Sequence, residues 1–318
     1  MNFIKSYSIL FLFFSISIKN SKAQDPIFSQ NLYTRTYLNP AIAGTDSTLV
    51  VSGGLQNQPS YNDVKYITYH FSADQYVRFL RGGLGFDAIH DVAGPASLTT
   101  TGYNLNYAPH FELFKKKLAV QLGFRVGYSQ KSIDWSNVTF DTIDARTGLV
   151  SPYSLPSSAK DKINYFDASS GIFMYTKNIY GGVALFHINQ PNEGLLTNIA
   201  LPMKLTINAG ANLSFKKDTK RDFIFSPNII YIKQQDISQL LVGITAKYKW
   251  FLLGVSYRND QTFIYNAGLQ FRYFKLGFSL GRSLSLLTNA INSSYEFQLI
   301  GFIPYRRKPC PIKTIRFI

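Results

Sequence analysis

Hydrophobic and polar residues alternate along much of this chain, most clearly in Leu118–Ser129. The even positions there read Leu, Val, Leu, Phe, Val and Tyr, whereas the odd positions read Ala, Gln, Gly, Arg, Gly and Ser. Successive side chains of a β-strand point to opposite faces, so the stretch predicts a strand with one apolar and one polar face. A tilted strand needs about ten residues to cross the hydrocarbon of a bilayer. The length of this pattern therefore favours a membrane-spanning strand.

The same alternation recurs often enough to predict a closed sheet. Lys204–Phe215 is nearly as regular, and twelve further segments bring the total to about fourteen strands, with 12 to 16 possible. A free sheet edge in lipid would leave backbone N–H and C=O groups without partners, so such a sheet must close. We predict an all-β fold, a closed antiparallel transmembrane β-barrel in residues 47–303. The other candidate strands are Thr48–Gln56, Tyr66–Ala73, Gly83–His90, Thr99–Tyr107, Phe166–Tyr175, Ile179–Ile188, Phe223–Ile232, Leu240–Tyr248, Phe251–Tyr257, Phe263–Arg272, Phe274–Gly281 and Ser294–Phe302.

The N-terminus has the features of an export signal. Lys5 precedes an apolar run from Ile9 to Ile18, and Ser21 and Ala23 provide small residues for cleavage. We expect a signal peptide in residues 1–23 and a periplasmic N-terminal segment in residues 24–46. The rest of the chain has no uninterrupted apolar stretch of about 18 residues, which argues against a helical anchor. Export together with the strand pattern predicts an integral protein of the bacterial outer membrane.

The connections between the predicted strands suggest an orientation. Those after every second strand are generally short and basic, and the others tend to be longer. In outer-membrane barrels the short turns face the periplasm, so both termini are expected there. The first such turn, Asp74–Arg81, is long for a turn. The insertion at 131–165 is expected to be a large extracellular loop, and residues 304–318 a basic periplasmic tail.

Composition agrees with a membrane barrel. The chain has 21 Tyr and 26 Phe but only 16% charged residues, as expected if aromatic rings line both rims of the barrel. The formal charge of +15 does not indicate nucleic-acid binding in an exported protein. Its basic clusters lie in turns, where solvated cations and a patch facing lipid phosphate are both possible. The single cysteine, Cys310, excludes an intramolecular disulfide.

No strong catalytic or metal-binding motif is present in the sequence. His70, His90 and His110 lack the spacing of metal ligands. Ser72 beside His70 is the best candidate for an outer-membrane hydrolase, but Ser is an ordinary residue of a barrel lumen. Asp141 and Asp144 lack calcium-loop spacing. We therefore expect no enzyme activity, no cofactor and no metal site.

Three motifs, in order along the chain, resemble a known family. The first runs from Gln24 through Asp25, Pro26, Phe28 and Gln30 to Asn39, Pro40 and Gly44. The second spans Tyr165–Gly171 with Asp167, continues to Tyr180–Val183, and ends with His187 and Pro191. The third comprises Ser294–Leu299 and the late pair Cys310 and Pro311. Together these segments resemble the PorP/SprF family of type IX secretion membrane proteins. The chain departs from the family pattern where Asn31 and Leu32 precede the aromatic Tyr33, and where Tyr295 replaces a common His.

The resemblance implies a role in a secretion and gliding apparatus. A member would support export or surface anchoring of a partner adhesin and contact periplasmic ring or peptidoglycan-binding components. A general diffusion porin is the main alternative, and an outer-membrane hydrolase is a further one. The motif residues of the first segment can be explained as shaping the entry to the first strand. The alternative is that Gln24–Gly44 docks a periplasmic partner.

Overall fold

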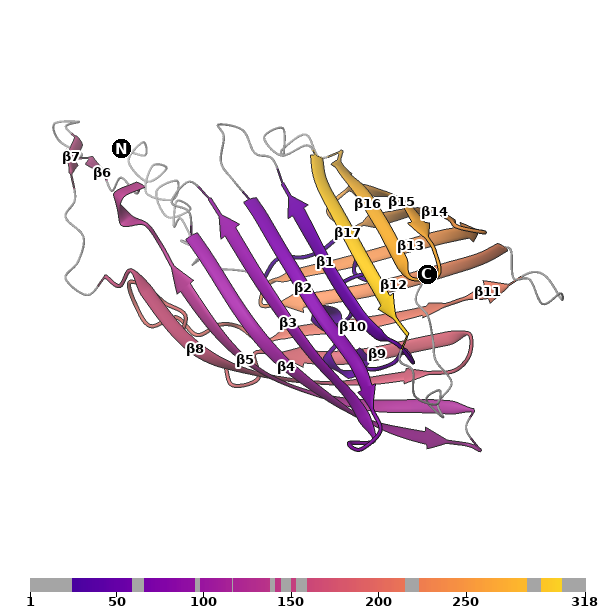
Figure 1. Ribbon diagram of the computed structural model, residues 1–318. Helices are drawn as coiled ribbons and strands as arrows, with labels where there is room; N and C mark the ends of the chain where they lie inside the picture. The colour runs from indigo at the N-terminus through magenta and orange to yellow at the C-terminus, as the bar shows by residue number, and fades with distance from the viewer. Residues whose placement is uncertain are drawn as a thin grey trace, which may run out of the picture.

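The computed structural model describes residues 25–58, 66–94, 98–115, 117–137, 141–143, 150–152, 159–214, 223–284 and 293–304. One antiparallel sheet closes on itself (Figure 1), because β10 pairs with β12. Fourteen strand positions form the barrel, and β11 (Leu213–Ser214) continues the eighth after a break at Asn212. The full-length strands are β1 (Leu49–Asn57), β2 (Tyr66–Val77), β3 (Gly82–Ala93), β4 (Leu98–Leu113), β5 (Leu118–Ser132), β8 (Lys162–Tyr175), β9 (Ile179–Phe186), β10 (Lys204–Ala211), β12 (Phe223–Gln234), β13 (Ile237–Tyr248), β14 (Phe251–Arg258), β15 (Thr262–Gln270), β16 (Phe274–Ser283) and β17 (Ser293–Ile303). The fourteen-strand prediction is confirmed.

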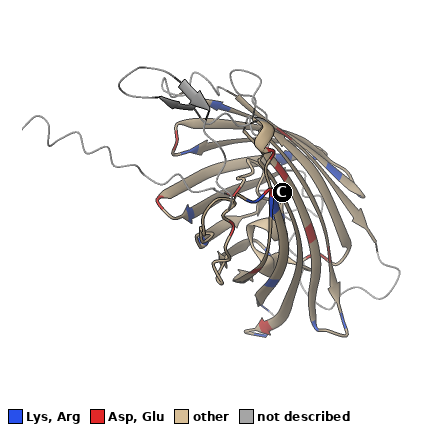
Figure 2. Cartoon of the chain, turned by 90° about the vertical axis from the view of Figure 1, so that its left-hand side faces the viewer, with Lys and Arg blue, Asp and Glu red and all other residues tan. Residues whose placement is uncertain are grey.

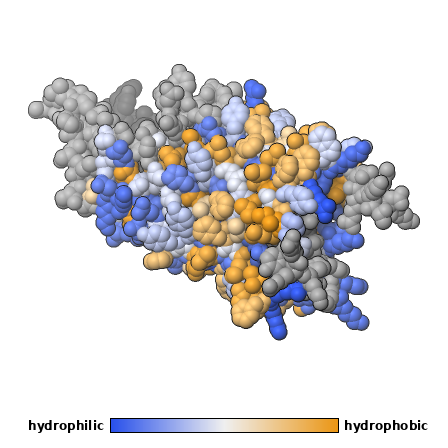
Figure 3. All heavy atoms as spheres, viewed as in Figure 1, coloured by the Kyte–Doolittle hydropathy of each residue, from blue (hydrophilic) through white to orange (hydrophobic). Residues whose placement is uncertain are grey.

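The two faces of the barrel wall differ as the alternation predicts. On β5, Phe124 and Val126 are 52% and 63% exposed, whereas Gln121 and Arg125 are buried. Since inward and outward residues alternate, the apolar set covers the outside and the polar set lines the lumen. Figure 3 shows the result as an apolar zone across the wall with hydrophilic residues towards both ends. Most of each strand is also free of charge in Figure 2.

Several strands run further than the alternation indicates. β2 continues through Asp74 to Val77, so the turn to β3 is short rather than long. β4 extends beyond Tyr107 to Leu113, although Pro109 lies within it. Proline has no N–H to donate, and the pairing of β4 with β5 is interrupted at this point. The pairing of β4 with β5 resumes at His110. The strand therefore continues, although the alternation of apolar and polar residues is lost after Tyr107.

The barrel has two ends that differ in their connections. We call the end at which β1 begins and β17 ends the turn end; its connections include residues 78–81, 176–178, 249–250 and 271–273. The opposite end, the loop end, carries the connections 133–161 and 187–203. The loop end also has short connections, at 235–236 and 259–261, so the predicted alternation of loop length is only partial. That the turn end faces the periplasm stays a prediction.

The connection between β5 and β8 is slightly shorter than the predicted loop at 131–165, because both strands extend into it. It contains the 3-10 helix η3 (Trp135–Asn137) and the paired β6 (Asp141–Ile143) and β7 (Val150–Pro152).

None of the helices in the described part of the chain is long and apolar enough to span a membrane.

Candidate functional site

The N-terminal segment, residues 25–46, lies inside the barrel. It contains helix α2 (Arg35–Leu38) and the 3-10 helix η1 (Pro40–Ile42). Thr34, Asn39 and Ala41 are fully buried although none of them belongs to the sheet. Their burial comes from the surrounding wall, because the segment forms hydrogen bonds with β1, β2, β5, β8, β10, β16 and β17. A segment that contacts the wall on so many sides occupies the cross-section of the lumen.

Asp74 on β2 holds the segment near the turn end. One carboxylate oxygen accepts a hydrogen bond from Nη2 of Arg35 at 2.8 Å, and the other accepts the backbone N–H of Gly44 at 2.9 Å. Both side chains of the ion pair are buried. Removing one partner of a buried pair leaves an uncompensated charge, so this contact strongly favours one position of the segment.

Asn39 connects η1 to the wall. Its Oδ1 accepts the N–H of Ala41 at 2.9 Å and caps the 3-10 helix, with Pro40 at the first helical position. Its Nδ2 donates to the backbone oxygen of Ile172 on β8 at 3.1 Å. A backbone oxygen inside the hydrogen-bonded sheet can accept this extra bond because it has two lone pairs. Asn39 thus lies at the C-terminus of α2, and its side chain caps η1 and fixes it against β8.

Inward-facing glycines make room for the segment. A Cβ added to Gly123 on β5 would overlap the backbone of Ala41, and one added to Gly83 on β3 would overlap the carbonyl of Ala43. Gly44 has φ +69°, a conformation that L-residues rarely adopt, and a Cβ there would meet Gly83. Glycine within a strand often marks the close approach of another backbone. The glycines of the lumen are therefore contact positions for the enclosed chain.

Glu296 on β17 binds the earlier part of the segment. Its carboxylate accepts the backbone N–H of Ser29 at 2.6 Å and that of Gln30 at 3.1 Å, and it also accepts Nε2 of Gln298. Glu296 is buried, and it is 266 positions away from Gln30 in the sequence. The C-terminal motif and the N-terminal motif therefore meet inside the lumen.

Asp25 joins the N-terminal motif to the central one near the loop end. Its carboxylate pairs with Nζ of Lys204, at the start of β10, and lies 2.8 Å from Nε2 of His187, just after β9. The Nδ1 atom of His187 lies 3.0 Å from Oδ1 of Asp167 on β8. The backbone N–H of Asp25 donates to Gln234 at 3.2 Å. We call Asp25, Asp167, His187 and Lys204 the Asp25 cluster.

The charges of the Asp25 cluster support one another. Burial alone would lower the pKa of His187, but the negative charge of Asp25 and the Asp167 and Asp25 carboxylates beside its two ring nitrogens outweigh it and raise the pKa to about 9. Burial would raise the pKa of Asp25, but Lys204 and His187 hold it well below its usual range. The geometry thus favours a charged His187 and an ionised Asp25 at neutral pH.

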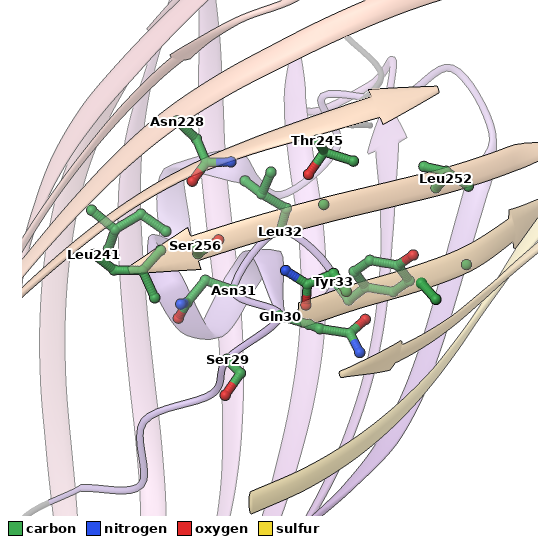
Figure 4. A pocket seen from close by; sticks show the side chains of 15 residues that line it. Ser29, Gln30, Asn31, Leu32, Tyr33, Asn228, Leu241, Thr245, Leu252 and Ser256 are labelled. Atoms are coloured by element: carbon green, nitrogen blue, oxygen red, sulfur yellow. The ribbon is translucent and has the colours of Figure 1, made fainter. Parts of the chain in front are cut away.

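A cavity of about 230 Å³ lies next to this cluster. Pro26 and Tyr37 of the enclosed segment and Arg125 of β5 line it, and Ala93, Leu98 and Leu201 line it towards the loop end. A much smaller pocket, about 50 Å³, separates residues 29–33 from strands β12–β15. Figure 4 shows Leu32 and Tyr33 of the segment among the side chains of this pocket. Of these two cavities, the larger therefore lies beside the Asp25 cluster.

The structure places most of the predicted motif residues in these contacts. Phe28 packs edge-on against Tyr37 and His70, the carbonyl of Pro26 accepts the Tyr37 hydroxyl, and a Cβ on Gly171 would meet Asn39. Pro191 lies in the β9–β10 connection, where its carbonyl accepts the N–H of Leu201. Cys310 and Pro311 lie outside the described residues, as do Asp144 and most of the predicted tail at 304–318.

One expectation about the N-terminal segment needs correction. We expected it to stand in the periplasm ahead of the barrel, but its described residues are buried in the lumen. The physical reason is that its buried polar contacts, and the glycines that make room for it, are distributed along the lumen. Asp25 lies towards the loop end, beside Lys204 and Gln234, whereas β17 ends at the turn end. That both termini face the periplasm stays a prediction, because residues 1–24 and 305–318 lie outside the described part of the chain.

The hydrolase candidate does not form a catalytic pair. The Ser72 hydroxyl lies 2.6 Å from that of Ser52, and His70 is buried against the rings of Phe28 and Tyr37. Among the described residues, no cluster of three or more His, Cys, Asp and Glu could hold a metal ion.

The sequence analysis did not identify Arg35, Asp74 and Gly123 as contact residues. The available signal for these contacts was that Asp74 and Gly123 occupy inward-facing positions in the alternation of their strands.

These features define a class of protein: an integral outer-membrane β-barrel whose own N-terminal segment occupies its lumen. The fold is similar to that of a deletion mutant of the TodX monoaromatic hydrocarbon channel (TM-score 0.50, 10% identity, covering 88% of this chain and 95% of that one). A Pseudomonas aeruginosa FadL homologue (TM-score 0.48, 10% identity) covers 86% and 94% of the two chains. At 10% identity the similarity to the TodX mutant shows the fold alone. No curated protein matches the sequence.

The family is shown by a match over most of the chain. The family model described as type IX secretion system membrane protein PorP/SprF matches residues 20–300. The chain belongs to this family, as the three motifs indicated.

Proposed function

We propose that this protein is a non-enzymatic barrel component of the type IX secretion and gliding machinery that supports export or surface anchoring of a partner adhesin. Family membership supports the setting. The observation that carries the proposal is the convergence of three family motifs on the enclosed segment, through Asp25, Asn39 and Glu296. Residues that only built a pore wall would not need to contact an N-terminal segment.

The occupied lumen argues against the general diffusion porin. A passive pore needs a continuous aqueous path, and residues 25–46 contact the wall on many sides of the lumen. A purified porin would conduct steadily without any partner. We expect the purified wild-type barrel in a planar bilayer to remain mostly closed.

The cellular test compares the surface proteins of wild-type cells with those of cells lacking this gene. Protease shaving followed by mass spectrometry should show the loss of at least one large adhesin, while other outer-membrane proteins remain. An unchanged set of surface proteins would contradict the proposal. Complementation with the wild-type gene is the control, since it should restore the missing adhesin.

The proposed partners also include periplasmic ring or peptidoglycan-binding components. The earlier idea that Gln24–Gly44 docks such a partner now requires that the partner reach into the lumen. Deleting residues 25–44 should leave an inserted barrel, because β1 begins only at Leu49. Co-purification of the same periplasmic partners with the deletion variant would show that the segment does not hold them.

A further inference from the structure

The Asp25 cluster is built to hold a carboxylate at the inner wall of a cavity. Lys204, at the start of β10, and His187, just after β9, approach the same Asp25 oxygen. Nζ of Lys204 lies 4.7 Å from the ring centroids of both Tyr37 and Phe186. An ammonium group between two aromatic rings is well placed but still needs a counter-ion, because it is buried. Asp25 supplies that counter-ion from the start of the described chain.

Asp25, which occupies this site, is more exposed to solvent than the cations that bind it. The Asp25 side chain is 18% exposed, whereas that of Lys204 is 4% exposed. The side chain of Asp25 therefore faces more open space than the cations that hold it. The adjoining 230 Å³ has room for a further side chain or a chain end.

A third cation lies on the same cavity. Arg125 is buried, and its guanidinium lies 5.5 Å from the Phe186 ring. Nη2 donates to Asp87 at 2.8 Å, but Nε and Nη1 have no hydrogen-bond partner among the described residues. Buried guanidinium N–H groups usually have acceptors, so two nitrogens of Arg125, which carry three N–H groups, lack acceptors beside this cavity. Their position favours a ligand with acceptor oxygens.

We propose that Lys204 and His187 form a binding site for the carboxylate of an incoming peptide, and that Asp25 is the internal ligand which that carboxylate displaces. The ligand class is a carboxylate on a peptide, because the present occupant is itself an acidic residue of a peptide segment that lies outside the sheet. The inference rests on the proposed function, since it makes the exported partner the source of that peptide. Displacing Asp25 would free the first residues of the segment and enlarge the cavity.

Asp25 acts at high effective concentration, so it should mask the site against a free ligand. The test therefore uses purified full-length barrel carrying Asp25→Ala and acetate as the probe. Acetate should raise the thermal unfolding midpoint of Asp25→Ala saturably, by roughly 2 °C or more. Acetamide, its neutral isostere, should not. Wild-type barrel should show less than half of the rise, because Asp25 already occupies the cations.

The double variant Asp25→Ala/Lys204→Met removes the main cation and should lose the acetate-dependent rise. The proposal would be overturned if acetamide raised the unfolding midpoint of Asp25→Ala as much as acetate does. It would also be overturned if acetate raised the midpoint of the double variant or of the wild type by the same amount. Each of these results would show a non-specific effect. No rise in Asp25→Ala would overturn it as well. If Asp25→Ala does not fold, Asp25→Asn replaces it and is judged by the same criteria. These outcomes concern the purified barrel, so their failure is distinguishable from failure of the cellular test for adhesin display.

Discussion

The barrel wall and the N-terminal segment inside it are stabilised by different interactions. The wall is held by a closed backbone ladder whose outer face is apolar, so each strand contributes many equivalent hydrogen bonds. The segment is held by a few specific side chains of the lumen, including Asp74, Glu296 and Lys204. A single substitution should therefore change the segment while it leaves the wall intact. The predictions below use this difference, from the largest expected effect to the smallest.

Gly123→Val should have the largest effect. The added side chain overlaps the backbone of Ala41, which cannot retreat without moving η1. We expect the segment to leave its position and single-channel conductance in planar bilayers to rise well above that of the wild type. Gly53→Val is the matched control, because the Cβ there meets only one backbone oxygen at 3.8 Å. If the two variants had equal conductance, the segment and the wall would not respond differently to substitution, and the proposed difference between them would be wrong.

Asp74→Asn should weaken the segment's attachment at the turn end. It removes the charge that pairs with buried Arg35, and breaking such a pair costs about 3–5 kcal/mol. Because the ladder between β1 and β2 does not involve this carboxylate, the barrel should still form. The expected result is faster trypsin cleavage at Arg35 in the folded barrel, measured by mass spectrometry. Unchanged protection of Arg35 would contradict the role assigned to Asp74.

Raising the pH should loosen the Asp25 cluster. The pKa of His187 is raised from 6.5 to about 9 in the folded protein, so its contribution is full below pH 6.5 and is lost as pH rises through about 9. The depressed pKa of Asp25 acts at the opposite limit: its contribution is present above about pH 3.8 and is lost as pH falls further. Asp25, Asp167 and Lys204 are the charged groups that face His187.

We therefore expect a spin label at position 27, in a Cys310→Ser background, to become more mobile between pH 7 and pH 10. The same measurement on His187→Gln should lose most of the change across this range, because glutamine does not titrate. A label with the same pH response in both proteins would show that another group controls the segment.

Ser72→Ala should have the smallest effect. Its hydroxyl contacts that of Ser52, and one such hydrogen bond contributes about 0.5–1.5 kcal/mol. We expect a small decrease in unfolding free energy in urea and no change in hydrolysis of a fluorogenic lipase substrate. Loss of a measurable lipase activity in this variant would favour the hydrolase reading instead.

The wall could be predicted from the sequence because its physics is local and periodic. In Leu118–Ser129 and Lys204–Phe215, lipid on one side and lumen on the other impose a period of two residues. All fourteen candidate strands overlap strands of the structure. Strand ends were less predictable, since Pro109 interrupts one ladder without ending β4.

The place of the N-terminal segment could not be predicted in the same way. Its elements are only three and four residues long, and its contacts depend on residues far along the chain, such as Glu296 for Gln30. The motif residues Asp25, Asn39 and His187 were recognisable, but nothing local indicated that they meet. Inward glycines such as Gly123 were a usable signal, because a strand glycine facing a lumen suggests that another backbone approaches it closely.

Disulfide trapping in intact outer membranes tests the central claim that the segment occupies the lumen. In a Cys310→Ser background, cysteines replace Ala43 of the segment and Gly85 of β3, since a Cβ on Gly85 would lie 3.3 Å from the Cβ of Ala43, close to the spacing of a disulfide. Cysteines at Ser52 and Ser72, whose hydroxyls lie 2.6 Å apart on paired strands, are the positive control. The account predicts that both pairs form disulfides, seen as a gel shift that reducing agent reverses. A disulfide in the control pair but not between positions 43 and 85 would contradict it.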